Sequence, residues 1–132
     1  MASAVYPSWI ENLMQFTANY DLDNANLKVA LVDTGTYTFS TAHQFYSSVS
    51  AGVVGTPVAL TTSRTYTGGV FDAADVTFTA VAGASVEAVV IYVDTGVAGT
   101  SPLFAYIDNI TVTPSGNDII VSWHATGILK LG

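Results

Sequence analysis

The sequence contains no cysteine and very few basic residues. Lysine and arginine together account for 3 of the 132 residues, against 10 aspartates and glutamates, and the formal net charge is -7. Without cysteine, neither disulfides nor thiolate metal sites can hold the chain together. A surface this acidic repels phosphate groups, so we expect no direct nucleic-acid partner and no anionic membrane partner.

Charge of either sign is scarce. Charged residues make up 10% of the chain and hydrophobic residues 50%, whereas soluble domains usually carry about 25% charged residues. Such a surface must consist largely of threonine, serine, glycine and apolar side chains. Because large exposed apolar patches usually mark interfaces, the composition favours a subunit of an assembly over an isolated monomer with a Thr/Ser-rich surface.

Long apolar runs are also missing. No segment has the roughly 20 apolar residues that a membrane-spanning helix needs, and the N-terminus lacks the charged and apolar regions of a signal peptide. We therefore expect a soluble protein that is made in the cytoplasm. The length suits one domain covering residues 1–132.

The most informative stretch that is present covers residues 85–96. Its odd positions Val89, Ile91 and Val93 are apolar, and so are the even positions between them. Successive side chains of a strand point to opposite faces, so both faces of this strand need to be buried. The stretch therefore predicts a central strand covered on both sides, ended by the turn residues Asp94, Thr95 and Gly96.

The rest of the chain predicts one short helix and further strands. Ser8 and Glu11 have the spacing of a capping box, and apolar residues then recur at helical intervals, which predicts a helix over about 9–18. That helix either covers one end of the core or docks onto a neighbouring subunit. From residue 27 to 131 the pattern predicts an all-β domain, a β-sandwich or small barrel of about 7–9 short antiparallel strands. The remaining strands are predicted at 27–33, 58–60, 63–67, within 70–78 on both sides of a turn, and at 103–110, 118–124 and 128–131. Side chains should alternate between the two faces along 103–110. The segment after the first strand predicts an ordered loop with one helical turn near 42–47, and Pro57 excludes a central-strand position there.

No constellation of residues predicts an active site. Ser122 and His124 stand too close on one strand for a nucleophile and its base, and His43 lies in an aromatic loop where a structural histidine is more common. Asp72 and Asp75 could pair as in a glycosidase, but their setting indicates a turn. We therefore predict no catalytic, cofactor-binding or metal-binding residue and no enzymatic activity.

Two binding alternatives remain at this point. The acidic and amide side chains of residues 21–26 are similar to a calcium loop, but the glycine and the bidentate glutamate that such a loop needs are missing, so a turn with Asx hydrogen bonds is the better interpretation. The chain also has seven tyrosines, six phenylalanines and two tryptophans. An exposed row of these rings could bind sugars on a host surface.

Several blocks of the sequence form an ordered pattern. They are LKVALVDT at 27–34, YTFS at 37–40, HQFY at 43–46, DVTF at 75–78, VVIYVDT at 89–95, SPLFAY at 101–106 and GNDIIVSWHATGIL at 116–129. These blocks resemble, in the same order and over about residues 13–131, a pattern found in small structural proteins of tailed bacteriophages. One departure is visible, because the pattern often has a basic residue near position 87 and a second acid near 93, where this chain has Glu87 and Val93.

The resemblance implies a non-enzymatic protein of the virion, made in the host cytoplasm. The best-fitting role is a capsid cement or decoration protein that bridges major capsid subunits. Its expected partners are the major capsid protein and copies of itself, as a trimer or another symmetric oligomer. A component of the tail or of the head–tail connector, and a module that binds host glycans, are the alternatives. Because copies carry like charge, contacts between them should strengthen or stay equal as salt is added.

Overall fold

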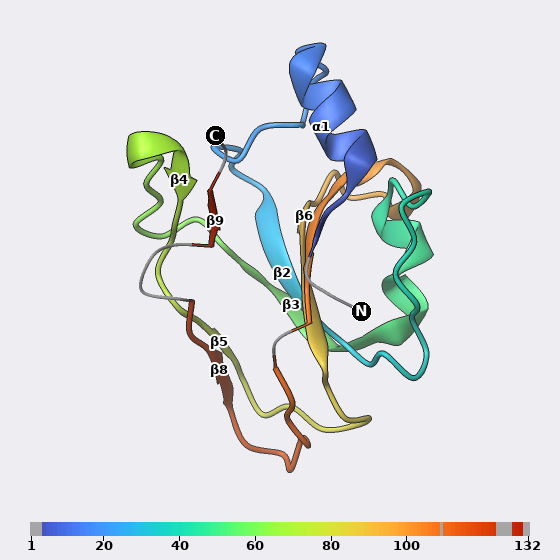
Figure 1. The fold of residues 1–132 in the computed structure, drawn as a ribbon. Coiled ribbons are helices and arrows are strands. Elements are labelled where there is room, and N and C mark those ends of the chain that lie inside the picture. Colours follow the sequence, from blue (N-terminus) through green and yellow to red (C-terminus); the bar gives the residue numbers. More distant parts are fainter. Residues whose placement is uncertain (1–3, 109, 124–127, 131–132) are drawn as a thin grey trace.

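A five-stranded antiparallel sheet forms the centre of the molecule, in the strand order β1-β7-β6-β2-β3 (Figure 1). The computed structural model describes residues 4–108, 110–123 and 128–130. Two two-stranded sheets, β4 with β9 and β5 with β8, lie beside the central sheet. The strands are β1 (Ala4–Val5), β2 (Leu27–Val32), β3 (Val53–Ala59), β4 (Val70–Phe71), β5 (Val76–Phe78), β6 (Ala88–Val93), β7 (Leu103–Ile107), β8 (Ile119–Val121) and β9 (Leu129–Lys130).

These elements confirm the all-β prediction with one short helix near the N-terminus. The helix, α1, spans Pro7–Met14, and four short 3-10 turns lie in the connections. In the part of the chain that the structure describes, none of the sheets closes into a barrel. The 3-10 turns are η1 (Tyr46–Ser48), η2 (Ser50–Gly52), η3 (Thr67–Gly69) and η4 (Ala98–Thr100).

Strand β6 lies in the middle of the central sheet, as its sequence predicts. All six of its residues are buried. Val89, Ile91 and Val93 belong to one core cluster, whereas Val90 and Tyr92 belong to the other. This alternation follows directly from the period of two in a strand.

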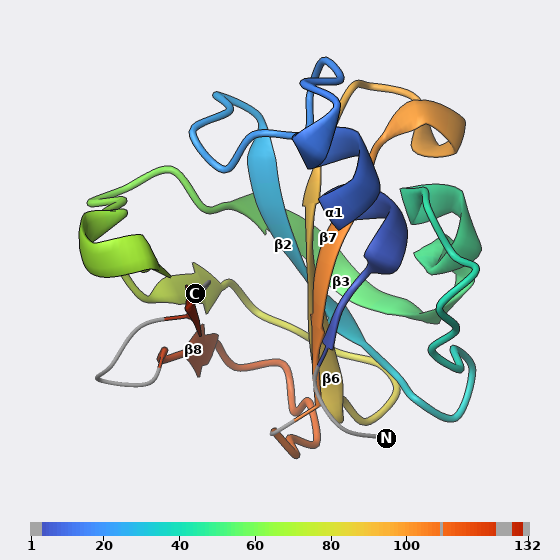
Figure 2. The ribbon, with the colours of Figure 1, turned by 45° about the horizontal axis from the view of Figure 1, so that its top comes forward.

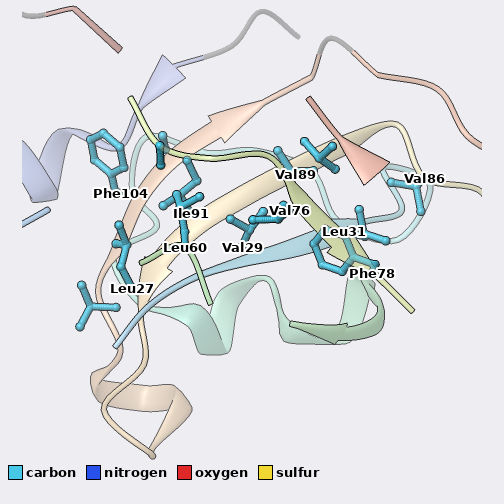
Figure 3. Close-up of a cluster of buried hydrophobic side chains, with 14 of the residues drawn as sticks. Leu27, Val29, Leu31, Leu60, Val76, Phe78, Val86, Val89, Ile91 and Phe104 are labelled. Carbon is cyan, nitrogen blue, oxygen red and sulfur yellow. The ribbon is translucent and has the colours of Figure 1, made fainter. Parts of the chain in front are cut away.

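A different layer covers each face of the central sheet. The larger core lies between β2, β6 and β7 on one side and the two small sheets on the other, and Figure 3 shows part of it. The smaller core lies on the opposite face, beneath the connection from β2 to β3 that contains η1 and η2 (Figures 1 and 2). In that smaller core Tyr46 stacks on Tyr92, with ring centroids 4.2 Å apart. The long connection thus acts as the second cover of the sheet.

Side chains of strand β7 do not follow the simple alternation between faces that was predicted for residues 103–110. Ile91 pairs with Ala105 but Tyr92 pairs with Leu103, so Phe104 is the extra residue of a β-bulge. As a result Phe104 and Ala105 both face the larger core, and Leu103 and Tyr106 face the smaller one. A bulge places two consecutive residues opposite one, which no count of alternating positions can anticipate.

The edge strand β3 is longer than predicted. It spans Val53–Ala59, and its register against β2 shifts between the pairs Val29–Val58 and Leu31–Val54. Pro57 falls within the shifted part, in agreement with the expectation that it occupies no central-strand position. The strand predicted at 63–67 is wrong, because Ser63 has a positive φ of 54° and only Thr65 bridges to Asp72.

Helix α1 begins earlier and ends earlier than the predicted range 9–18. Tyr6 is its N-cap residue and Pro7 occupies the first helical position, where a proline needs no N–H partner. The capping box is therefore wrong: Ser8 lies inside the helix, and no side chain caps the N-terminus. Ser8 Oγ is buried without a hydrogen-bond partner among the described residues.

Two further boundaries differ from the predictions. The helical turn expected near 42–47 is the 3-10 turn η1 at Tyr46–Ser48. The strand expected at 118–124 is confirmed only as β8, Ile119–Val121, and its predicted end at His124 lies outside the described residues. Trp123 leaves the ladder, since its N–H donates to Asp75 Oδ1 at 3.2 Å and its indole N–H to the Ala74 carbonyl at 3.1 Å.

Candidate interaction surface

Large exposed apolar side chains gather on α1 and on the residue pair that follows it. Within the described residues seven large hydrophobic side chains are exposed, and four of them come from this one segment. We call these four, Ile10, Leu13, Met14 and Phe16, the α1 surface. The other three are scattered over separate connections and strands: Tyr66, Val97 and Ile120.

One buried ring of α1 fixes the helix to the core. Trp9 is 1% exposed, and its ring lies 5.3 Å from that of Tyr20 and 5.1 Å from that of Phe104. Just before the helix, the Tyr6 N–H donates to the Phe104 carbonyl at 2.9 Å. Figures 1 and 2 show the result: the helix stands at one end of the sheet, and its C-terminal turn projects beyond the strands.

The end of α1 has an unusual residue at the turn. The Thr17 N–H donates to the Asn12 carbonyl at 2.9 Å and the Phe16 N–H to the Leu13 carbonyl at 3.1 Å, which is the hydrogen-bond pattern of a Schellman motif. The motif requires a left-handed residue, here Phe16 with a φ of 55°. Glycine is the usual residue at this position, whereas Phe16 is a bulky side chain that is 95% exposed.

The charge near the α1 surface is negative. Glu11 is exposed one turn before Met14, so the two side chains are neighbours on the helix. The described basic side chains are both engaged elsewhere: Lys28 Nζ donates to Asp94 Oδ2 at 2.8 Å, and Arg64 Nη1 donates to two backbone carbonyls. The side chain of Lys130 lies outside those described.

The acidic loop at 21–26 is a turn with side-chain hydrogen bonds, as predicted. The Asn26 N–H donates to Asn24 Oδ1 at 2.9 Å, and Asn24 Nδ2 donates to Asp21 Oδ1 at 3.1 Å. Arg64 donates to the carbonyls of Leu22 and Asn24, which are the kind of oxygen that a calcium loop would direct at the ion. The guanidinium of Arg64 therefore already occupies two carbonyl oxygens that a bound calcium ion would need.

His43, one of the residues considered for catalysis, has a structural hydrogen-bond partner. His43 Nδ1 is 2.8 Å from Tyr37 Oη, which is itself 2.8 Å from Tyr6 Oη. Burial raises the pKa of both tyrosines, so both hydroxyls stay protonated at neutral pH. His43 is thus a hydrogen-bonded structural histidine, as expected.

The two aspartates proposed as a carboxylate pair each bind backbone. Asp72 Oδ1 accepts from the Ala73 N–H at 2.9 Å, and Asp75 Oδ1 accepts from the Trp123 N–H. The pairing of Ser122 with His124 falls partly outside the described residues. Within the described part of the chain, no group of three or more His, Cys, Asp or Glu side chains could hold a metal ion.

One hollow in the surface has a polar lining. Its volume is about 360 Å³, and Glu87, Asp108 and Phe39 are among the residues that line it. Glu87 Oε1 accepts from the N–H and the hydroxyl of Thr34 at 3.0 and 2.9 Å. Hydrogen bonds from Ser85 and then from Thr34 lower the pKa of Glu87, so its carboxylate is charged at neutral pH.

The sequence analysis considered α1 as a docking helix but did not single out Phe16. The signal that could have found it was the absence of glycine after residue 14, because a helix that ends without glycine must place another residue in the left-handed region or end differently. An exposed row of aromatics, which the sugar-binding alternative would need, is absent from the described residues, where most rings are buried and only Phe16 and Tyr66 are strongly exposed.

Comparisons with known proteins add no relative. No protein-family model matches the chain, and no curated protein matches it. No helix in the described part of the chain is long and apolar enough to cross a membrane. Function must therefore be inferred from the residues and their arrangement.

Proposed function

We propose that the protein is a non-enzymatic structural protein of a tailed-phage virion and that it serves as a cement or decoration protein on the capsid. The observation that carries this proposal is the α1 surface, where four large apolar side chains are exposed on a helix that the core holds in place. Such a surface is typical of a contact with another protein. The ordered sequence blocks and the low charge density support the same conclusion.

In the proposed mechanism the protein adds contacts between neighbouring subunits of the major capsid protein. A standard protein–protein interface buries roughly 1,600 Å², and contacts repeated over a symmetric shell reinforce one another through effective concentration. Rupture of the shell by genome pressure then requires these extra contacts to break. Copies of the protein, as a trimer or another symmetric oligomer, complete the arrangement.

The proposal is tested with particles that lack the protein. Purified protein is added, its occupancy is measured, and its position is located by electron microscopy. We expect binding to the outer surface of the head and a gain in the temperature at which the particles release their genome. Occupancy without any gain in heat resistance would contradict the cement role.

A tail or connector component is the first alternative within the virion. In that case the same apolar surface would join copies into a ring, and microscopy would locate the protein at the portal or along the tail. Head decoration and ring formation therefore give different positions in the same experiment.

Glycan binding is a second candidate, favoured by the polar hollow. Phe39 offers a ring, the hydroxyls of Thr34 and Thr38 and the charged Glu87 offer hydrogen-bond partners, and these groups line one concave site. Sugar sites combine such groups. Binding of the isolated protein to a glycan array, weakened by Phe39→Ala, would support this candidate, and an empty array would contradict it.

A further inference from the structure

Phe16 occupies a position that is unfavourable for stability. Its backbone has a φ of 55°, in the left-handed region where Cβ comes too close to the following carbonyl oxygen. Its ring gains almost no burial in return, because 95% of it is exposed. Selection for folding alone would favour glycine at this turn. The benefit of phenylalanine must therefore come from outside this chain.

The backbone under Phe16 is well held. The two hydrogen bonds of the Schellman motif fix the turn, and the buried Trp9 ring fixes the helix against Tyr20 and Phe104. Met14, which is 71% exposed, precedes Phe16 by two residues. An aromatic side chain presented on a rigid support loses little conformational entropy when it is buried by a partner. This is the property of a binding anchor.

The charges around Phe16 indicate what kind of partner fits. Glu11 is exposed on the same helix, and the whole chain carries a net charge of -7. A second copy could complement Glu11 only with a cation, yet the described cations Lys28 and Arg64 are already bound within their own chain. Charge complementarity therefore favours a different protein whose surface carries lysine or arginine.

We propose that Phe16, together with Met14, inserts into an apolar socket on the major capsid protein and that basic side chains at the rim of this socket face Glu11. This inference deepens the proposed function and rests on it for the identity of the partner. Aromatic residues that fill a pocket at the centre of an interface commonly supply most of its binding energy, while charged pairs at the rim chiefly raise the association rate.

The decisive variant is Phe16→Gly, measured for binding to capsids that lack the protein. Glycine removes the ring and also relieves the left-handed backbone, so the variant should be at least as heat-stable as the wild type. Its affinity for the capsids should nevertheless fall about 30-fold or more, the loss expected for an anchor residue. A loss of binding with unchanged or higher stability cannot result from misfolding.

Ile120→Ser is the matched control. Ile120 is also an exposed apolar residue, but it belongs to β8, far from α1 in Figure 1. We expect this variant to bind the capsids like the wild type. Equal losses in both variants would overturn the specific role of Phe16, because any exposed apolar group would then serve.

Salt and Glu11→Gln test the basic rim. Association of the wild type with capsids should slow as salt is added, and Glu11→Gln should associate more slowly with a flatter salt dependence. Association that is indifferent to salt and to Glu11→Gln would overturn the charged rim. Association between acidic copies would instead become faster as salt is added, because salt screens their mutual repulsion.

The remaining outcomes separate this inference from the proposed function. If the wild type binds capsids and Phe16→Gly binds equally well, the anchor is overturned and the cement role stands. If Phe16→Gly instead abolishes self-association in sedimentation experiments and leaves capsid binding intact, the occupant is a second copy and the inference is overturned. If the wild type does not bind capsids, both proposals fail.

Discussion

Strand β6 and helix α1 use their apolar residues in opposite ways. Every side chain of β6 is buried, on both faces of the sheet. In α1 only Trp9 is buried, although the helix also contains Ile10, Leu13 and Met14. The strand therefore contributes all of its apolar surface to the core, whereas Ile10, Leu13 and Met14 of the helix keep part of theirs exposed.

The contrast shows that hydrophobic residues alone do not mark the core. A pattern in which both faces are apolar has no solvent side left, so β6 must lie inside. An amphipathic helix leaves open whether its apolar side faces its own chain or another one. In α1 one large ring is fully buried, Ile10 and Leu13 are more than one-third exposed, and Met14 is mostly exposed.

The largest effect is expected where the helix does join the core. Trp9→Ala should lower the free energy of unfolding by about 3–5 kcal/mol, because the ring is fully buried against Tyr20 and Phe104. Denaturant unfolding measures the change. Met14→Ala on the same helix is the control and should shift stability by less than about 0.5 kcal/mol. Similar losses of unfolding free energy in the two variants would contradict the conclusion that Trp9 joins the core and Met14 does not.

A nearly equal effect is expected in the strand. Ile91→Ala should cost about 2–5 kcal/mol, since the side chain is fully buried in the larger core. Ile120→Ala, at an exposed position of β8, should cost little. A variant Ile91→Ala that melts at the wild-type temperature would show that β6 is not the centre of the fold.

A smaller effect is expected at the margin of the central sheet, where Asp94 follows β6. Hydrogen bonds from Lys28 and the Gly96 N–H lower the pKa of Asp94 below its ordinary value of 3.8. A carboxylate whose pKa is lower in the folded state stabilises the protein above its unfolded-state pKa, and this stabilisation is lost as the pH falls through the folded-state pKa. Both partners are about one-third exposed, so the contribution should stay below about 1 kcal/mol.

The measurement is the unfolding free energy of the wild type and of Asp94→Asn between pH 6 and pH 2. Asparagine keeps an acceptor for the Gly96 N–H but cannot form the ion pair. We expect the wild type to be more stable at pH 6 and the two curves to converge at the acidic end. A constant difference over the whole range would rule out the charge as its cause.

The smallest effect is expected at Ser8. Its hydroxyl is buried without a hydrogen-bond partner among the described residues, and Tyr6 rather than Ser8 is the N-cap. Ser8→Ala removes an unsatisfied polar group and introduces a better helix former. We expect the melting temperature to stay equal or to rise slightly. A clear fall in the melting temperature would instead support the capping box.

The regular parts of the fold follow from local patterns. The pattern of residues 27–33 correctly predicts β2, and the stretch 85–96, which is apolar on both faces, correctly predicts β6 as a strand buried on both sides. The bulge at Phe104 could not be predicted, since it depends on how β7 pairs with β6 rather than on β7 itself. The helix predicted over 9–18 starts too late, because Pro7 occupies the first helical position.

The candidate surface was predicted only in outline. Low charge density indicates that some apolar surface must be exposed, but it does not say where. The location depends on which side of α1 the core selects, and that choice depends on Tyr20 and Phe104, which are distant from Trp9 in the sequence. Likewise, the left-handed conformation of Phe16 arises from the path that the chain takes after the helix.

The two edges of the central sheet determine whether a strand of another chain could pair with this sheet. At one edge β3 contains Pro57, which has no N–H to offer, and a shifted register; at the other, the described part of β1 is two residues long. Within the described residues, neither edge offers the long, regular row of backbone groups on which a further strand could grow. These two edges therefore disfavour the edge-to-edge pairing of chains that leads to fibrous aggregates.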